Sequence, residues 1–273
     1  TVKGQDNKFI FDTDGPLEKL TLSRAETDKS INDKDDAKGF DFPPLTNLKE
    51  LHLPALKTLK WRGDFNNYKA LTTIDAPLLE NIPSETFISC DELDSVYLPG
   101  VKEIDGGAAF YKCNKLRGID CPACTKVGNS FVSETPNLKT LNFPAMKDVG
   151  EFWFSGISSV TTINLPNAEN IGNDAFYACT SLTDLRAPNV KTIGSYAFYN
   201  CSSLTSVNMP YVTSSGSTAF SQCTKLSSVN LPELQSMSGE SFAGDVLLTE
   251  LHLPNLTTLL NGGLYIPNIR VLD

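Results

Sequence analysis

The sequence predicts a repeat solenoid built on a parallel β-sheet, and three observations lead to that prediction. A segment with a leading aliphatic residue recurs ten times, and successive segments start 22 or 23 residues apart. Each segment alternates apolar and polar residues near its start, which is the period of a β-strand. A proline follows that alternation in every segment and is the seventh residue of the segment. The segments begin at Leu48, Leu71, Leu93, Leu116, Leu138, Val160, Leu182, Leu204, Leu226 and Leu248.

Each repeat position, numbered from the leading aliphatic residue, has its own structural meaning. Positions 4 and 6 are apolar and alternate with polar positions 3 and 5, which predicts a short strand. Proline at position 7 ends that strand because it has no N–H to donate to a ladder. Further along, the best copies read Gly-x-x-Ala-Phe-x-x-Cys, as in 172–179 and 194–201, and Phe and Cys three apart suit one helical or 3-10 turn.

The fold that these positions predict is a leucine-rich-repeat solenoid in which stacked copies share one continuous core. One parallel β-sheet is expected on the concave face. Short 3-10 or helical turns and irregular backbone are expected on the convex side. Residues 48–273 are expected to form a single elongated domain of about ten 22–23-residue repeats. Residues 1–47 are expected to form an N-terminal cap and a first irregular repeat with an insertion.

Composition and charge exclude several classes of function. The chain of 273 residues has a formal net charge of -9, which disfavours nucleic acid and anionic membranes as partners. It contains no apolar run of about eighteen residues, so we expect no membrane insertion by this segment. The start Thr1-Val2-Lys3-Gly4 shows no signal peptide, and we interpret the chain as a mature or trimmed one that is a monomer.

The cysteines are the most reactive residue type in the chain and allow two interpretations. Cys121 and Cys124 form a CxxC motif beside Pro122, which could be a redox pair. They also occupy positions 6 and 9, which are apolar in the other copies, so we favour a core assignment. Five more cysteines lie near position 20, where stacked neighbours could pair as a disulfide but neither histidine is near enough for a metal site. These five are Cys90, Cys113, Cys179, Cys201 and Cys223.

A phenylalanine recurs near position 17 of most copies and predicts a buried aromatic stripe. A stack for nucleobases would need basic flanking residues, which the sequence lacks. The stripe is therefore assigned to the core. It consists of Phe87, Phe110, Phe131, Phe154, Phe176, Phe198, Phe220 and Phe242.

The exposed strand face is the predicted ligand-binding surface, because solenoids bind partners along extended sheet faces. Exposed strand positions must be polar for solubility in any case, so the pattern also has a purely structural interpretation. Four of the residues are asparagines, which are poor strand formers, and amide hydrogen bonds between coils would explain them. The position-5 residues are His52, Asp75, Tyr97, Asp120, Asn142, Asn164, Arg186, Asn208, Asn230 and His252.

Other candidate residues receive simpler assignments. His52 and His252 lie nine repeats apart, so we expect two isolated surface histidines and no shared metal. Tyr97, Trp61 and Trp153 are aromatic residues of the kind that interfaces favour, although Trp153 lies in the Phe region and could be core. The acidic runs 12–15 and 33–36 do not complete a calcium loop and are assigned to solvated turns.

The consensus LxxLxLPxxxxxIGxxAFxxCxxL resembles the BspA-like branch of leucine-rich repeats. The segments IGNDAFYACTSL (171–182) and IGSYAFYNCSSL (193–204) match it closely, and the resemblance extends over 48–273. Departures occur where 61–70 lacks the Ala-Phe and Cys portion, where Val132 follows a displaced Phe131, and where Gly244-Asp245 replaces the Cys region. These departures put only the local shape of those turns in doubt.

The resemblance implies a bacterial surface or secreted adhesin that binds host matrix proteins or other cells. It implies no catalytic residues, no metal and no cofactor, so we expect a non-catalytic binding module for a protein or glycan ligand. A passive structural spacer, a glycan-binding scaffold and a thiol redox enzyme acting through Cys121 and Cys124 are the alternatives. Alkylation of the native protein tests the last of these, because a redox thiol would react fast.

Overall fold

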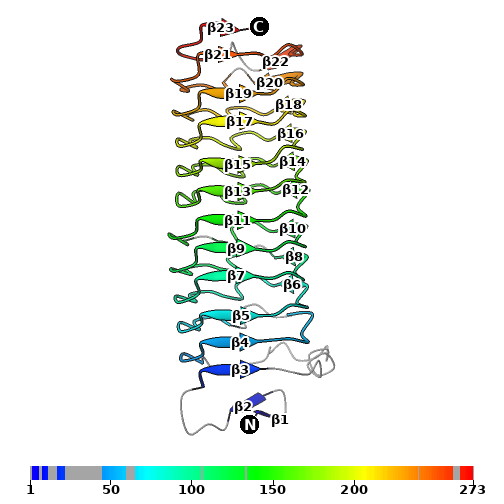
Figure 1. Cartoon of the computed structure of the whole chain (residues 1–273), viewed down its shortest axis with the longest axis vertical. Coiled ribbons are helices and arrows are strands. Elements are labelled where there is room, and N and C mark those ends of the chain that lie inside the picture. Colours follow the sequence, from blue (N-terminus) through cyan, green and yellow to red (C-terminus); the bar gives the residue numbers. More distant parts are fainter. Residues whose placement is uncertain are drawn as a thin grey trace. The chain divides into compact units, whose positions relative to one another are not determined.

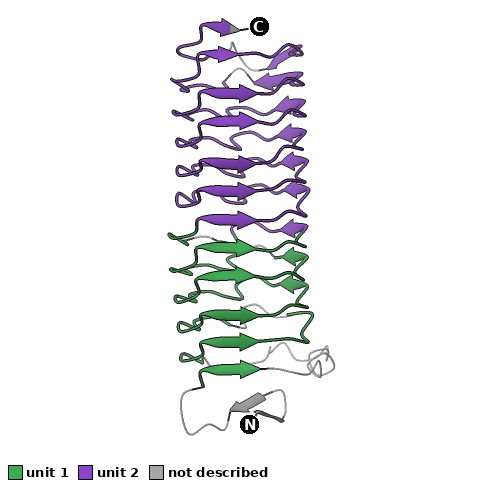
Figure 2. Cartoon of the chain, viewed as in Figure 1, with its two compact units in different colours: residues 1–124, 131–138 green, residues 125–130, 139–273 purple. Residues whose placement is uncertain are grey.

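The chain forms stacked coils of short β-strands, which divide into two compact units (Figure 2). Unit 1 comprises residues 1–124 and 131–138, and unit 2 comprises residues 125–130 and 139–273. The strands within each unit follow one another coil by coil (Figure 1). The computed structural model describes residues 2–5, 8–11, 17–21, 45–59, 65–105, 107–132, 134–238, 240–260 and 265–272.

In unit 1 the strand predicted at positions 3 to 5 is present in every coil. The middle residue of each strand is buried, for example Leu51 and Ile74, and the two flanking side chains face outward. Strands β3, β4 and β5 pair in parallel and in register, and so do β7 and β9. These strands are β3 (Lys19–Thr21), β4 (Glu50–His52), β5 (Thr73–Asp75), β7 (Ser95–Tyr97) and β9 (Gly118–Asp120).

The same strand recurs throughout unit 2. Its members pair in parallel as β11-β13-β15, as β17-β19 and as β21-β23. The main-chain N–H after the strand also bonds to the next coil, as from Leu165 to Arg186 at 2.8 Å. These strands are β11 (Thr140–Asn142), β13 (Thr162–Asn164), β15 (Asp184–Arg186), β17 (Ser206–Asn208), β19 (Ser228–Asn230), β21 (Glu250–Leu251) and β23 (Val271–Leu272).

A second strand, at positions 11 and 12 of the coils from Leu71 onward, was not predicted. In unit 2 it forms a parallel sheet in the order β12-β14-β16-β18-β20-β22. Most of its members have only two residues, which is too short for a periodic pattern in the sequence. They are β12 (Asp148–Val149), β14 (Asn170–Ile171), β16 (Thr192–Ile193), β18 (Ser214–Ser215), β20 (Ser236–Ser238) and β22 (Thr258–Leu260), and β10 (Lys126–Val127) is a further second strand of the unit outside this sheet.

Unit 1 has the same second strand, and its N-terminal residues add a small hairpin. β6 (Asn81–Ile82) and β8 (Glu103–Ile104) pair in parallel. β1 (Val2–Gln5) and β2 (Lys8–Phe11) pair antiparallel, an arrangement that the repeat pattern did not predict.

The turn that carries the recurring Phe is not a helix, and the described residues contain no helix anywhere. Asp174 and Ala178 adopt left-handed backbone angles, with φ of 53° and 55°, on either side of Phe176. The N–H groups of these three residues donate to the next coil at 2.7–2.9 Å rather than back along their own coil. The predicted 3-10 or helical turns are therefore wrong, because the polar backbone is satisfied between coils.

A continuous aromatic core runs through each unit, as predicted. All eight phenylalanines of the stripe are at most 1% exposed. In unit 2 the rings of Phe176, Phe198 and Phe220 stack with centroids 5.2 Å apart. In unit 1 the ring of Phe65 stacks on that of Phe87, with centroids 5.6 Å apart. The repeat that starts at Leu48, which lacks the Ala-Phe motif, therefore still contributes an aromatic residue to the core.

Candidate ligand-binding faces

The predicted position-5 residues of unit 1 all lie on the outward face of the first-strand sheet. His52 and Asp120 are half-buried, and Asp75 and Tyr97 are exposed. Tyr97 is 60% exposed, so its ring faces solvent. Register places Tyr97 beside Asp120 on the next strand. The four residues therefore share one face of unit 1.

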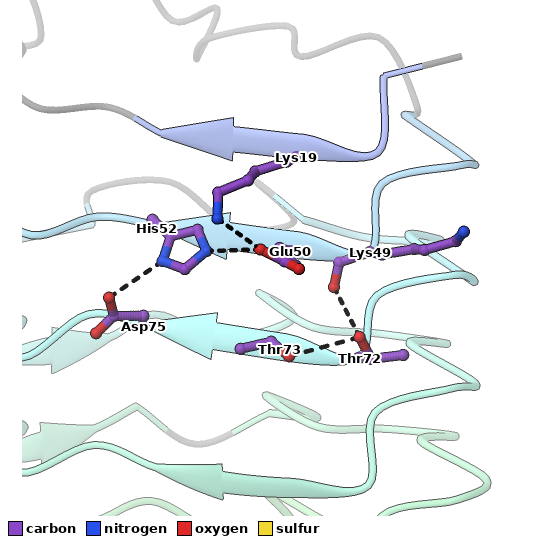
Figure 3. A network of polar contacts seen from close by, with 7 residues as sticks. All are labelled: Lys19, Lys49, Glu50, His52, Thr72, Thr73 and Asp75. Carbon is purple, nitrogen blue, oxygen red and sulfur yellow. Dashed lines mark hydrogen bonds and ion pairs between the residues drawn. The ribbon is translucent and has the colours of Figure 1, made fainter.

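His52 is the centre of a charged cluster on this face (Figure 3). Its Nδ1 lies 3.1 Å from Oδ2 of Asp75, and its Nε2 lies 3.1 Å from Oε2 of Glu50. The Nζ of Lys19 donates to the same Glu50 oxygen at 2.8 Å. The prediction that His52 is an isolated surface histidine is wrong, because parallel register brings Lys19, Glu50 and Asp75 around it.

The contacts of this cluster favour the protonated, charged form of His52. The hydrogen bond to Asp75, and then that to Glu50, raise the pKa of His52. The hydrogen bond from Lys19 is the main reason that the pKa of Glu50 is lowered. A protonated imidazole can donate from both ring nitrogens, one to each carboxylate, whereas a neutral ring can donate from only one.

Most position-5 side chains of unit 2 already form hydrogen bonds with other side chains of that unit. Asn164 donates its amide to Oδ1 of Asn142 at 2.6 Å, and Asn230 donates to Oδ1 of Asn208 at 2.7 Å. The prediction that asparagine amides bond between coils is confirmed for both pairs. Arg186 is also engaged, through Asp184 on its own strand. His252 is exposed at the end of the row.

Trp153 and Trp61 are the other aromatic candidates for an interface. Trp153 is 1% exposed and packs edge-on against Phe154 and Phe143, so the core alternative is correct for it. Trp61 and the acidic runs 12–15 and 33–36 lie outside the described residues.

All seven cysteines are buried and free. Burial, with the nearby Cys124 as a smaller cause, raises the pKa of Cys121 well above its ordinary value. A thiol in such a site is protonated and inert, which is the opposite of what a redox pair requires. Cys121 and Cys124 therefore belong to the core, as their repeat positions predicted.

The cysteine row near position 20 has a structural role that the sequence did not predict. The Sγ of Cys201 donates to the carbonyl of Phe176 in the preceding coil at 3.3 Å, and Cys223 donates to Phe198 at 3.2 Å. Burial raises the pKa of Cys179 to about 12. Each thiol thus serves as a small buried donor that satisfies a turn carbonyl.

A groove of about 590 Å³ lies in unit 2, away from the predicted face. It runs along the bend between the first and second strands, and its walls come from repeat positions 8 and 10 of successive coils. Sequence reasoning missed it because polar residues in a turn have no distinctive period. The lining residues are Ala145, Lys147, Asn167, Glu169, Asn189, Lys191 and Tyr211.

The described residues form neither a candidate metal site nor a membrane-spanning helix. No group of three or more His, Cys, Asp or Glu side chains there could hold a metal ion. No helix in that part of the chain has the length and apolarity to cross a membrane.

The repeated coils, their parallel strands and their stacked phenylalanines define a leucine-rich repeat solenoid protein. A profile described as BspA type leucine-rich repeat region, with six copies, matches residues 40–158 and 147–265. The chain therefore belongs to the BspA-type leucine-rich repeat family. None of the curated proteins matches it.

Solved structures of bacterial leucine-rich repeat proteins are similar to this chain. A leucine-rich repeat protein from Bacteroides ovatus is 17% identical with a TM-score of 0.54, over 97% of this chain and 85% of its own. A protein from T. pallidum is 28% identical with a TM-score of 0.42, over 65% and 75%. A leucine-rich cell surface protein from Faecalibacterium prausnitzii is 17% identical with a TM-score of 0.38, over 79% and 73%. The Bacteroides ovatus structure supports the assignment of this chain to the leucine-rich repeat fold.

Proposed function

We propose that this chain is a non-catalytic binding module of a bacterial surface or secreted protein, and that its ligand is a protein. Leucine-rich repeat proteins generally bind proteins or other ligands, and membership of the BspA-type family supports this role. The position-5 rows are the proposed contact surface. Within them, unit 1 is the favoured part, because the asparagines of unit 2 already bond to one another.

The exposed ring of Tyr97 is the observation that carries the proposal. Neighbouring residues at position 3 are Ser95 and Gly118, which are too small to cover the ring. Tyrosine contributes a rigid, amphipathic contact and is common at the energetic centre of interfaces. Asp75 and Asp120 on the flanking strands add negative charge. A protein segment with a basic side chain would complement this combination of ring and carboxylates.

Binding of the full chain to a panel of immobilised extracellular matrix proteins tests the proposal. We expect at least one member to bind, and Tyr97→Ala to weaken binding by at least about tenfold, as loss of a central aromatic residue does. Tyr265→Ala is the matched control, because Tyr265 is 65% exposed but lies in unit 2, outside both rows. Equal binding by wild type and Tyr97→Ala would show that the site lies elsewhere.

A further inference from the structure

We infer that the groove of unit 2 is a second binding site, and that it takes a short oligosaccharide. It is separate from the proposed protein-binding face, so either site can exist without the other. Its volume of about 590 Å³ lies within the usual range of small-ligand sites, roughly 300–1,000 Å³. It runs from Ala145 to Tyr211, which are three coils apart. At roughly 4.8 Å per coil it is elongated along the stack of coils, as a linear ligand requires.

One wall of the groove is a row of asparagines at position 8 whose amides are held in place. The Nδ2 of Asn167 donates to the carbonyl of Pro144 at 2.8 Å, and the Nδ2 of Asn189 donates to that of Pro166 at 2.7 Å. This bond restrains each amide and uses its Nδ2, so the Oδ1 is the group that remains to accept from a ligand. Pre-oriented acceptors of this kind suit ligand hydroxyl groups, because no side-chain freedom is lost on binding.

A second row of the lining, at position 10, alternates charges and is also held by the main chain. The N–H of Glu169 donates to the carbonyl of Lys147, and that of Lys191 donates to Glu169, both at 2.7 Å. The Lys191 ammonium pairs with the Glu169 carboxylate at 2.6 Å. This hydrogen bond, more than the charge of Lys147, lowers the pKa of Glu169, which therefore remains ionised.

Tyr211 closes one end of the groove with a ring that is 57% exposed. A pyranose has an apolar C–H face that packs against the electron-rich face of an aromatic ring. Its hydroxyl groups both donate and accept, so they match the mixture of amide oxygens, carboxylate and ammonium groups along the walls. A phosphate or sulfate would suit the site less well, because Glu169 lies between the two lysines and would repel it.

Titration calorimetry of the full chain with maltotriose, cellotriose and N,N′,N″-triacetylchitotriose tests this inference. We expect at least one trisaccharide to bind, with an affinity that changes little between low and high salt because hydroxyl contacts are only weakly screened. Tyr211→Ala should weaken that binding by about tenfold, and Asn189→Ala should weaken it by a similar factor. Tyr196→Ala is the matched control, since Tyr196 is an exposed tyrosine of the same unit outside the groove.

The inference fails if none of the three trisaccharides binds at millimolar concentration. It also fails if Tyr211→Ala binds as wild type does, or if Tyr196→Ala loses as much affinity as Tyr211→Ala. Binding that disappears in high salt would indicate an ionic contact with the lysines and would overturn it as well. Thermal unfolding of each variant shows whether lost binding is a loss of fold.

Discussion

At the scale of single residues, two ionisable side chains have surroundings that shift their pKa. His52 is held between two carboxylates on the exposed face of unit 1. Asp245 replaces the cysteine of the other coils in unit 2, and its side chain is buried. Among the described residues no hydrogen bond of normal geometry reaches the carboxylate of Asp245, and the nearby main-chain N–H of Cys223 offsets only part of the effect of burial on its pKa. The two residues therefore make opposite contributions to stability.

The contacts of His52 should stabilise the protein at acidic pH. Because the folded state raises the pKa of His52, its contribution is full below the ordinary histidine pKa of about 6.5 and is lost as pH rises through the raised value. His52→Gln should therefore lower the free energy of unfolding at about pH 5.5 by more than at about pH 8. The site is exposed, so the effect should stay below about 1 kcal/mol. Urea unfolding measures it, and an equal loss at both pH values would contradict the assignment.

Asp245 should destabilise the protein as pH rises. Burial raises its pKa to about 8, so the folded state retains a proton that the unfolded chain releases near pH 4. Stability should be greatest below about pH 4 and should fall up to about pH 8 from this group alone. Asp245→Asn keeps the shape and removes the charge, and at pH 8 it should stabilise by on the order of a few kcal/mol. A variant with unchanged stability at high pH would show that the carboxylate is hydrated.

At the scale of elements, the close approach of successive turns depends on glycine at position 13. A Cβ built on Gly216 would lie 2.4 Å from the main-chain N of Ser195, and one on Gly194 would lie 2.5 Å from that of Asn173. These contacts are to backbone of the preceding coil, which cannot move without disturbing the second sheet. The glycines of the Gly-x-x-Ala-Phe motif are thus required by coil spacing and not by a positive φ.

Gly216→Ala should consequently destabilise unit 2 by roughly 1–3 kcal/mol, the usual cost of overpacking. Gly150 provides the matched control at the same repeat position, because a Cβ there would meet its nearest neighbours at 3.8 Å. Gly150→Ala should therefore change the unfolding midpoint little. Thermal and urea unfolding distinguish the two variants, and equal effects would mean that the coils adjust their spacing freely.

At the scale of the whole molecule, stability should be shared between neighbouring coils. Each coil bonds through its strands and turns to the coil before it and the coil after it, as Phe176 bonds to Ala197. The ring of Phe198 likewise stacks on rings of both adjacent coils, Phe176 and Phe220. In a repeat array of this kind the free energy is a sum of coil and nearest-neighbour contributions.

Double-mutant cycles on the phenylalanine column test that description. Phe198→Leu and Phe220→Leu remove rings 5.2 Å apart, so their effects on the free energy of unfolding should differ from additive by at least about 0.5 kcal/mol. Phe176→Leu and Phe242→Leu lie three coils apart in the same unit and should add within about 0.5 kcal/mol. Strong coupling of the distant pair would contradict a nearest-neighbour account.

The sequence by itself determined the repeat, the first strand of each coil and the apolar core. These features are periodic, and burial imposes the same residue type at the same position in every copy, so Phe198 and Cys121 could be assigned without coordinates. The same register correctly predicted which amides bond to each other, because Asn142 and Asn164 occupy equivalent positions.

Only the tertiary structure decided the second sheet, the non-helical turns, the His52 cluster and the groove of unit 2. The second strands are too short to show a period, and the turns satisfy their N–H groups across coils, which no local pattern encodes. The cluster and the groove join side chains of neighbouring coils whose types differ from copy to copy, as those of His52 and Asp75 do at position 5. Stacking of the coils brings such unlike residues together, so their contacts can be identified only when the register of the coils is known.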